Sequence, residues 1–536
     1  MLLLTGLPPE ILHEVLGYVD PPDLAVVPRV CHALYRVVKG NEWVFKQVYL
    51  HHLDTPPSQQ GIQYENLLKD FVRLQTICRG QSLHDKKTEL NFVHQTVTSL
   101  LKKASHSSDS AEPASTGFQF PRFKSRNADT LARIFSDDSN KSAFLCRSFI
   151  YERARAGFHD NGNLNSGFYG PSKPEYQKSA HLRKFDSFLI PTARHCLFGV
   201  PQLAIPPTSR ETRRSKMSPF ACSKVYDLRQ YNERNQWGPF MDDGTMRVDW
   251  EKVEAVMIVL GANMANLSLS RFPMCDIFTS APFTGTWPGS WKSPHKKIVP
   301  PPPDSLEHLD PYGVSGIWMR VVCFLDYTDF FAYNFGSDTQ LPLHVPRPAI
   351  DYGEATRLIF MSIFVTAVEP PGPEDGQDLP VVHFKGVSRS ADRSFDDNAD
   401  SDLRGAVRLT REGEVRWTTY SIFGGVERWR SESVQVGGVK SAKGVLGHWF
   451  DKDFDLRGPA GPTAFWKVSD KIHRLKTGGE DDDSDEGMFD DLDIYDDGDY
   501  VELEVEFMEE DESEDEEESE LEGDLSELAD GEGPSS

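Results

Sequence analysis

Short strand-like runs in the second half of the chain constrain its fold more than any other sequence feature. After about Phe283, runs of β-branched and aromatic residues alternate with glycine- and proline-rich breaks, and few helical patterns interrupt them. The runs are 317–325, 358–368, 381–387, 406–409, 415–422, 434–436 and 464–468. Glu412-Gly413, Gly424-Gly425 and Gly437-Gly438 are plausible turns between them. This pattern is typical of an antiparallel β-barrel or sandwich.

The first half of the chain has the opposite texture, because its apolar residues recur at helical spacing. The helical stretches are 11–19, 30–38, 67–78, 90–101, 131–150 and 249–260. Asp23 and Asp249 stand where helices would begin, so both are candidate N-caps. Pro8 and Pro9 fit the first turn of a helix, where a missing N–H costs little. Together the two halves predict an α+β multidomain protein.

The net charge of −26 is concentrated at the C-terminal end of the chain. Residues 480–536 contain 30 acidic and no basic residues, so residues 1–479 carry a net charge of +4. This balance excludes a polybasic protein that wraps nucleic acid, and no specific nucleic-acid partner is expected. Within the acidic tail (471–536), residues 501–507 alternate strictly between apolar and acidic side chains. They predict one strand, able to add to an edge of the β domain, between two disordered charge runs.

Several classes of protein are excluded by composition and motif. No apolar run reaches the roughly 20 residues of a membrane-spanning helix, so no membrane association is expected. The seven cysteines are scattered without a Cys-x-x-Cys pair, which favours reduced thiols in the cytoplasm or nucleus. No hydrolase, phosphate-binding, zinc-protease or dinucleotide motif is present. We therefore expect no catalytic residue, no metal site and no cofactor.

The N-terminal 50 residues carry the most specific motif. They contain Leu7-Pro8-Pro9-Glu10-Ile11-Leu12, an aliphatic pair one turn later, Asp23-Leu24, Val30-Cys31 and a late Trp43. Three helices this short cannot bury all of their apolar side chains among themselves. Chains of about 40 residues usually need a partner, a disulfide or a metal for stability. Since neither a disulfide nor a metal is expected here, the surplus apolar face is predicted to dock on another protein.

This segment (3–50) resembles an F-box, because these residues stand in the order and spacing of that family. The resemblance implies a three-helix motif that binds a Skp-type adaptor, which links F-box proteins to the cullin scaffold of an SCF ubiquitin ligase. It also implies that nine residues build this motif or contact the adaptor. They are Leu7, Pro8, Ile11, Leu12, Val15, Leu16, Leu24, Val30 and Leu34. The rest of the chain, in particular 220–249 and 413–468, is similar to fungal F-box proteins of the same layout.

In F-box proteins the region after the box selects the substrate, so the β-rich region is the candidate receptor for an unidentified protein. Seven of the ten tryptophans lie between Trp287 and Trp466, and most are expected in the core. One or two could instead line a peptide-binding groove beside arginines, since both types are frequent hot-spot residues. The candidate substrate-binding residues are Trp287, Arg416, Trp417, Arg428, Trp429 and Arg430. Phe283-x-Gly285-x-Trp287 is also similar to the opening of lipocalin-like barrels and of C-terminal domains in some F-box proteins.

The predicted organisation has six parts. They are an F-box (3–50), a helical segment (60–102), a flexible linker (103–122), a mixed helical and loop region (123–260), a β-rich substrate-recognition domain (261–470) and the acidic tail. The leading hypothesis is a non-catalytic substrate receptor of an SCF-type ubiquitin ligase that directs proteins to proteasomal degradation. Two alternatives stay open. One is a non-degradative F-box scaffold whose acidic tail binds basic partners, and the other is a ligand-binding barrel or unrecognised enzyme fused to an F-box.

Overall fold

The computed structural model describes twelve stretches of the chain. They are residues 6–58, 60–106, 124–140, 143–144, 150, 218–266, 283–291, 305–336, 341–343, 345–350, 353–391 and 400–472. The chain divides into two compact units, residues 1–476 and 477–536, and every described residue belongs to the first. Most of the predicted linker and nearly all of the acidic tail, including the predicted strand at 501–507, therefore lie outside the described residues.

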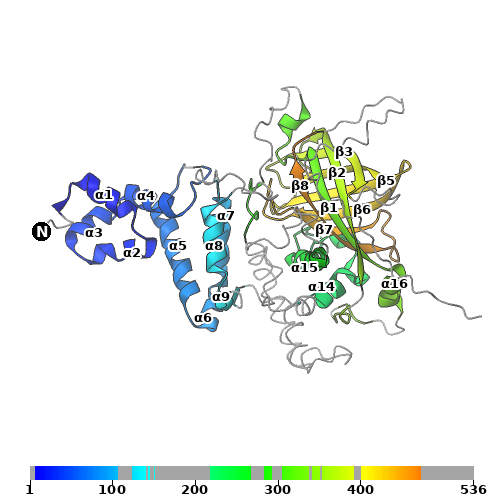
Figure 1. Ribbon diagram of the computed structural model, residues 1–536, viewed down its shortest axis with the longest axis horizontal. Coiled ribbons are helices and arrows are strands. Elements are labelled where there is room, and N and C mark those ends of the chain that lie inside the picture. The colour runs from blue at the N-terminus through cyan, green and yellow to red at the C-terminus, as the bar shows by residue number, and fades with distance from the viewer. Residues whose placement is uncertain are drawn as a thin grey trace, which may run out of the picture. The chain divides into compact units, whose positions relative to one another are not determined.

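The N-terminal region is helical, as its periodicity predicts (Figure 1). Helix α1 begins at Pro9, which agrees with the prediction that proline starts this helix. Asp23 lies inside α2 and Asp20 precedes that helix, so the prediction of Asp23 as an N-cap is wrong. The first elements are α1 (Pro9–Gly17), α2 (Pro21–Leu24), η2 (Val27–Arg29), α3 (His32–Val38) and α4 (Glu42–His52). They are followed by α5 (Tyr64–Arg79), α6 (Leu83–Thr88), α7 (Leu90–Lys102), α8 (Arg126–Ile134) and α9 (Asp138–Asn140).

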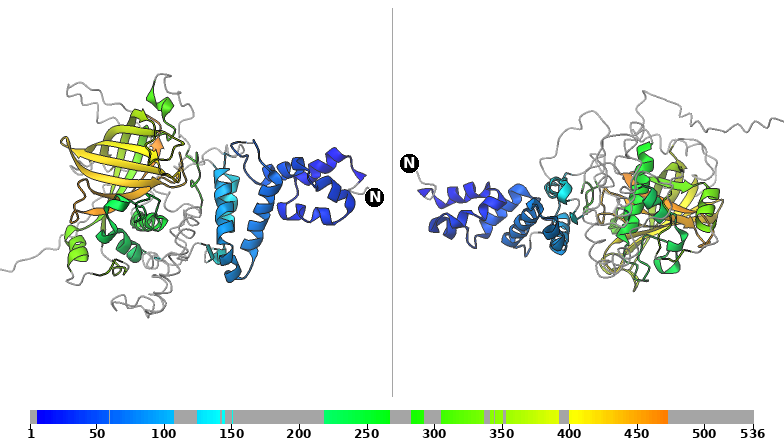
Figure 2. Two further views of the ribbon diagram at one scale, coloured as in Figure 1. Left: turned by 180° about the vertical axis from the view of Figure 1, so that it is seen from behind. Right: turned by 90° about the horizontal axis from the view of Figure 1, so that it is seen from below.

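One hydrophobic core runs through these helices from Leu12 in α1 to Leu131 in α8. Figures 1 and 2 show α5 beside α7 and α8, and α4 connects α1 to α5. The buried carboxylate of Asp54, directly after α4, ties the two groups of helices together. It accepts hydrogen bonds from the backbone N–H of Ser105 at 3.2 Å and of Arg126 at 2.8 Å. The backbone N–H of Asp54 donates to Asn127 Oδ1 at 2.9 Å. Through these contacts the first helices continue into a larger helical module.

The second half of the described chain forms a closed eight-stranded antiparallel barrel in which each strand pairs with its sequence neighbours. β1 pairs with both β2 and β8, which closes the ring and confirms the barrel over the sandwich. The strands are β1 (Gly316–Leu325), β2 (Glu354–Glu369), β3 (Val381–Ser390), β4 (Ser401–Leu409), β5 (Val415–Phe423), β6 (Val426–Gln435), β7 (Val445–Asp451) and β8 (Ala460–Ser469). None of these eight strands has a free edge, so this barrel offers the predicted tail strand no edge to extend.

An aromatic cluster fills one part of the barrel interior. The ring of Trp417 lies 5.0 Å from Trp318, 5.4 Å from Phe465 and 5.7 Å from Phe384, measured between centroids. Tilted and edge-on contacts of this kind are favourable beyond the area they bury. The three predicted glycine turns connect β4 to β5, β5 to β6 and β6 to β7, and all their glycines have positive φ angles.

Short helices cover part of the outer surface of the barrel. Helix α15 (Trp250–Asn266) contacts β1, β7 and β8. Asp249 caps this helix as predicted, because its carboxylate accepts the N–H groups of Glu251 at 3.0 Å and Lys252 at 3.2 Å. The remaining elements are α14 (Ser218–Val225), η4 (Leu228–Gln230), η5 (Glu233–Asn235), η7 (Leu306–Leu309) and α16 (Tyr327–Phe335).

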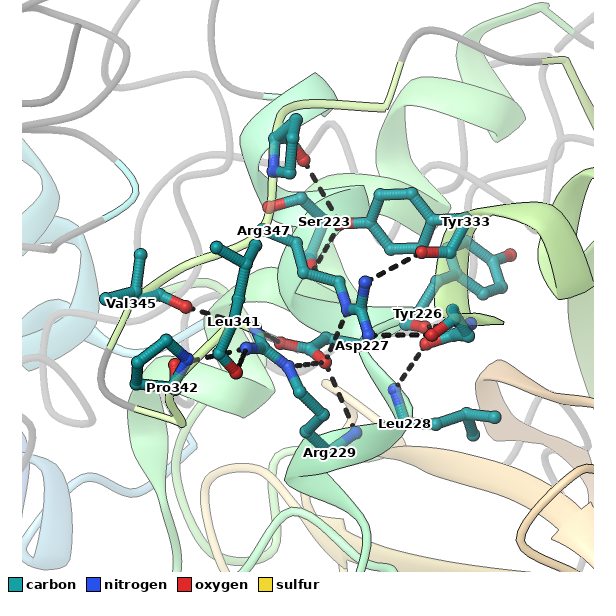
Figure 3. Close-up of polar contacts among 12 residues, drawn as sticks. Ser223, Tyr226, Asp227, Leu228, Arg229, Tyr333, Leu341, Pro342, Val345 and Arg347 are labelled. Carbon is teal, nitrogen blue, oxygen red and sulfur yellow. Dashed lines mark hydrogen bonds and ion pairs between the residues drawn. The ribbon is translucent and has the colours of Figure 1, made fainter. Parts of the chain in front are cut away.

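A buried charge cluster fastens the segment between α14 and η4 to the chain after α16 (Figure 3). Asp227 has 4% of its side chain exposed and pairs with Arg229 at 2.7 Å and Arg347 at 3.2 Å. Arg229 also donates to the carbonyl oxygens of Leu341 at 2.8 Å and Val345 at 3.1 Å. Because every charged group has a partner, the cluster meets the condition under which buried charges are tolerated, and we assign it a structural role.

Residues 283–291 connect the helical core to the barrel. Phe283 and Trp287 belong to the hydrophobic core of the helices, where Phe283 lies 5.5 Å from the ring of Phe135. In the same segment, the N–H of Gly289 donates to the carbonyl of Val439, between β6 and β7, at 2.9 Å. The Phe-x-Gly-x-Trp motif therefore lies outside the barrel strands and forms part of a junction.

Candidate functional site

Helix α1 separates the predicted adaptor-binding residues onto two faces. Leu12 and Leu16 are 4% and 2% exposed, and they point into the helical core. Ile11 and Val15 are 51% and 41% exposed. Residues four apart lie on one side of a helix, so these two side chains form one apolar row facing solvent. The first pair maintains the fold, and the second pair is available for contact with another protein.

The other predicted residues divide in the same way. Leu24 and Leu34 are buried, whereas Val30 is 69% exposed. Leu7 is half-buried and Pro8 is exposed. The same region exposes further large apolar side chains that are not among the nine predicted residues, namely Tyr18, Val26, Tyr35 and Trp43. We call Ile11, Val15, Val30 and these four residues the exposed apolar set.

A polar junction orders α3 and α4 next to α1. Asn41 caps α4 by accepting the N–H of Val44 at 3.4 Å, and its amide donates to the carbonyl of Val37 in α3 at 3.0 Å. The same amide nitrogen lies 3.2 Å from Nε2 of His13 in α1. These contacts hold three short helices in one arrangement although much of their apolar surface stays outside the core.

In the barrel, the predicted tryptophans and arginines point in opposite directions. Side chains alternate between the two faces of a strand, so Trp417 faces the interior while its neighbour Arg416 faces outward. Trp417 has no exposed surface, and Trp287 is buried in the helical core. Trp429 is half-buried, stacks edge-on against Trp449 at 5.3 Å and lies beneath the exposed Arg428 at 4.8 Å. The structure therefore does not bring the six predicted substrate residues into one site.

It does bring Arg416 and Arg430 together on the outer surface, at the carboxylate of Glu432. Arg416 Nε donates to Glu432 Oε2 at 2.9 Å, and Arg430 Nε donates to Glu432 Oε1 at 3.0 Å. Glu432 is fully buried. Burial opposes ionisation of this carboxyl, but the two guanidinium groups outweigh it and hold the pKa of Glu432 below its ordinary value.

A groove lies above this ion pair on the outer face of β3, β4, β5 and β6. Its volume is about 280 Å³. The lining residues are His383, Arg404, Gly405, Ala406, Arg408, Arg416, Thr418, Tyr420 and Arg430. We call this surface the arginine groove. Sequence reasoning missed Arg404 and Arg408, because only the strand register shows that Arg408 lies opposite Arg416 and that Arg404 lies opposite Tyr420.

The N-terminal motif agrees with a comparison to protein families. Residues 4–51 match the family model described as F-box-like. The chain thus contains an F-box-like domain, and the exposed apolar set lies within it. Comparison of the whole chain with curated proteins and with solved structures finds no match. The similarity of the remaining regions to fungal F-box proteins stays a prediction.

Two searches of the described residues bear on other kinds of site. No helix among them has the length and apolar character needed to cross a membrane. In the same part of the chain, no group of three or more His, Cys, Asp or Glu side chains is arranged to hold a metal ion.

Proposed function

We propose that this protein is a non-catalytic substrate receptor of an SCF-type ubiquitin ligase, with the exposed apolar set as its surface for a Skp-type adaptor. The observation that supports this proposal is the division of α1 into a buried face and an exposed apolar face. Burying apolar surface stabilises a complex by about 25 cal/mol per Å². Solvent exposure of Ile11, Val15 and Val30 is therefore unfavourable unless a partner covers them.

The experiment that tests this proposal is co-purification of the full chain with a Skp-type adaptor. Ile11→Asp combined with Val15→Asp should reduce adaptor binding at least tenfold, because both carboxylates would be buried without partners at the interface. The fold should persist, since both positions are exposed. Leu12→Asp is unsuitable, because that side chain lies in the core and its substitution would unfold the helices.

Leu456→Asp is the matched control. Leu456 is 70% exposed and follows β7, so this substitution makes the same chemical change far from the F-box-like domain in the sequence. Adaptor binding should be unchanged by it. Undiminished binding of the Ile11→Asp, Val15→Asp protein, with its helices intact by circular dichroism, would contradict the assignment of this surface.

The barrel is the proposed substrate-binding part of this receptor. A receptor of this kind accelerates ubiquitin transfer by proximity, because it holds a target lysine near the charged ubiquitin carrier and so raises its effective concentration. This role requires a surface that binds protein and no acid–base chemistry. The arginine groove supports it, because arginine is enriched at the centres of protein interfaces.

A further inference from the structure

We propose that the arginine groove binds a phosphate group on a phosphorylated segment of a protein substrate. This inference specifies the ligand of the substrate-binding part of the proposed function. It rests on four observations: the placement of like charges, the way the arginines are held, the availability of their N–H groups, and the size of the groove.

The strand register places cations directly opposite one another. Lys385 pairs with Arg404 between β3 and β4, and Arg408 pairs with Arg416 between β4 and β5. Like charges at such positions destabilise a sheet. The carboxylates of Glu427 and Glu432 offset part of this repulsion at Arg404 and Arg416, so the two pairs are only partly compensated within the barrel. An anion bound among these side chains would remove the remaining repulsion between the cations, which would explain why they are placed opposite one another.

Aromatic rings and carboxylates hold these arginines in place. Tyr420 in β5 pairs with Arg404 of β4 and with Arg430 of β6. The guanidinium of Arg404 lies 3.9 Å from the centre of the Tyr420 ring, and that of Arg430 lies 5.5 Å from it. Arg416 lies 5.3 Å from the ring of Phe240. Planar guanidinium groups fixed by stacking lose little conformational entropy when they bind an anion. The site is therefore largely organised before a ligand arrives.

Donor groups remain available in the groove. Arg408 is 32% exposed, and its nearest acidic partner is Asp375 at 3.7 Å, beyond hydrogen-bond distance. Its Nε is buried and has no hydrogen-bond partner. Arg416 uses only Nε for Glu432, so its two terminal nitrogens can donate to another acceptor. Unsatisfied N–H groups of arginine match the oxygen atoms of a phosphate in charge and geometry.

The size and charge of the groove favour one phosphate on a protein over a nucleic acid. Four arginines line it, and the carboxylates of Glu432, Glu427 and Asp375 pair with them, which leaves a small local excess of positive charge. A nucleic-acid backbone needs a long basic stripe that contacts many phosphates. A single phosphorylated side chain needs a few converging donors within a volume of this order.

The experiment uses the full chain and two immobilised peptide libraries. One has phosphothreonine at a fixed position among degenerate neighbours, and the other has threonine at that position. The chain should be retained by the phosphorylated library only. Millimolar inorganic phosphate should compete, whereas chloride at equal ionic strength should not. A labelled single-stranded 20-nucleotide DNA tests the nucleic-acid alternative, and tighter binding to the DNA than to the phosphopeptides would overturn the proposal.

Arg404→Gln and Arg408→Gln are the informative variants, because both side chains are partly exposed and neither pairs with the buried Glu432. Each should weaken phosphopeptide binding about tenfold, as expected for the loss of one charge-assisted contact. Arg411→Gln is the control. That arginine lies in the turn after β4, pairs with Glu374 and lies outside the groove, so its loss should change nothing.

The proposal is overturned if neither library retains the chain, if both do so equally, or if the two variants bind as well as the Arg411→Gln control. The measurement needs no adaptor. Failure here with intact adaptor binding would reject the groove alone. Loss of adaptor binding with intact phosphopeptide binding would reject the F-box part of the proposed function.

Discussion

At the scale of single residues, Glu432 shows how the barrel organises its outer surface. The carboxylate has no exposure, yet it stays ionised because Arg416 and Arg430 donate to it and Thr418 adds a hydroxyl at 3.1 Å. Leaving one member of such a group buried without its partner costs more than the intact group contributes. Glu432, Arg416 and Arg430 are therefore needed for the fold. The partly exposed Arg404 and Arg408 are the groove residues that can be changed without disturbing this ion pair.

We predict that Arg416→Gln destabilises the barrel by about 3–5 kcal/mol, because it leaves a buried carboxylate short of one cation. The free energy of unfolding from urea titration, followed by tryptophan fluorescence, measures this change. Combining Arg416→Gln with Glu432→Gln should recover much of the loss. A double variant as unstable as the single one would show that the ion pair is not the cause.

The burial of His448 makes the free energy of unfolding depend on pH. It lies opposite Glu432 in the pairing of β6 and β7, it is 3% exposed, and its Nδ1 has no hydrogen-bond partner. Burial, assisted by the positive charges of Lys252 and Lys224, lowers the pKa of His448 to about 3. Between about pH 6.5 and pH 3 the unfolded chain holds a proton here that the folded chain does not. Stability from this group is therefore complete above pH 6.5 and falls as the pH is lowered.

The expected loss is about 1.4 kcal/mol per pH unit within that window. Urea titrations at pH 7, 6 and 5 would measure it. His448→Gln should reduce the slope by that amount, since every other titrating group is common to both proteins. An unchanged slope in the variant would mean that His448 gains its proton without unfolding.

At the scale of elements, a strand was predictable where an unbroken apolar run marks it, and it was missed where polar residues (β6) or a Gly447-His448 interruption (β7) break the run. The run 317–325 differs from β1 by one residue. By contrast, only 434–436 was predicted in the region of β6 (Val426–Gln435), and β7 was not predicted. β6 carries Ser431 and Ser433 toward the interior and charged residues outward, so both of its faces are polar in sequence. Pairing with β5 and β7 makes it a strand.

The same limit applies to the candidate sites. The sequence motif located the apolar residues of the F-box-like domain, but only packing distinguishes Leu12 from its exposed neighbour Ile11. Arg416 and Arg430 were selected because they stand beside tryptophans. They share a site because strand pairing brings them to Glu432, and Trp417 faces the other way. Proximity in sequence to a tryptophan therefore selected two arginines that the structure brings together for a different reason, and their role in substrate binding stays a prediction.

The turns between strands give a matched pair of predictions. Gly413 and Gly437 both have positive φ angles, of 85° and 90°. A Cβ atom at Gly413 would meet nothing within 4 Å, whereas one at Gly437 would lie 2.5 Å from the carbonyl carbon of Thr286. Gly413→Ala should cost about 1 kcal/mol for the backbone conformation alone.

Gly437→Ala should cost clearly more, because the added methyl would push residues 283–291 away from the hairpin between β6 and β7. Thermal unfolding of the two variants measures the difference. Equal losses of stability in the two variants would mean that residues 283–291 accommodate the added methyl group without a loss of packing. The comparison separates the strain of one turn from the packing of two segments.

At the scale of the described molecule, the F-box-like domain continues into a larger helical core instead of ending at residue 51. The buried Asp54 joins α4 to the ends of α7 and α8, and Phe283 and Trp287 complete the same core from far along the sequence. The surface proposed to bind the adaptor is therefore supported by residues outside the F-box-like match at 4–51.

We predict that Trp287→Ala destabilises the helical core by about 3–5 kcal/mol, as for other large-to-small substitutions of buried aromatic residues. Phosphopeptide binding should be unchanged, because Trp287 lies outside the arginine groove. Circular dichroism at 222 nm, followed through thermal unfolding, reports the helices. A stable Trp287→Ala protein that has lost peptide binding would instead support the original prediction that Trp287 contacts substrate.

The pairing of β1 with β8 has a consequence for how the barrel is made. Ile317 and Ser469 must meet, although the other six strands lie between them in the sequence, and such distant pairings form slowly. Until β8 arrives, β1 and β7 each present an open row of N–H and C=O groups, which is a template for aggregation. A chain truncated before β8 would keep both rows open permanently. The last strand therefore protects the solubility of the seven strands that precede it.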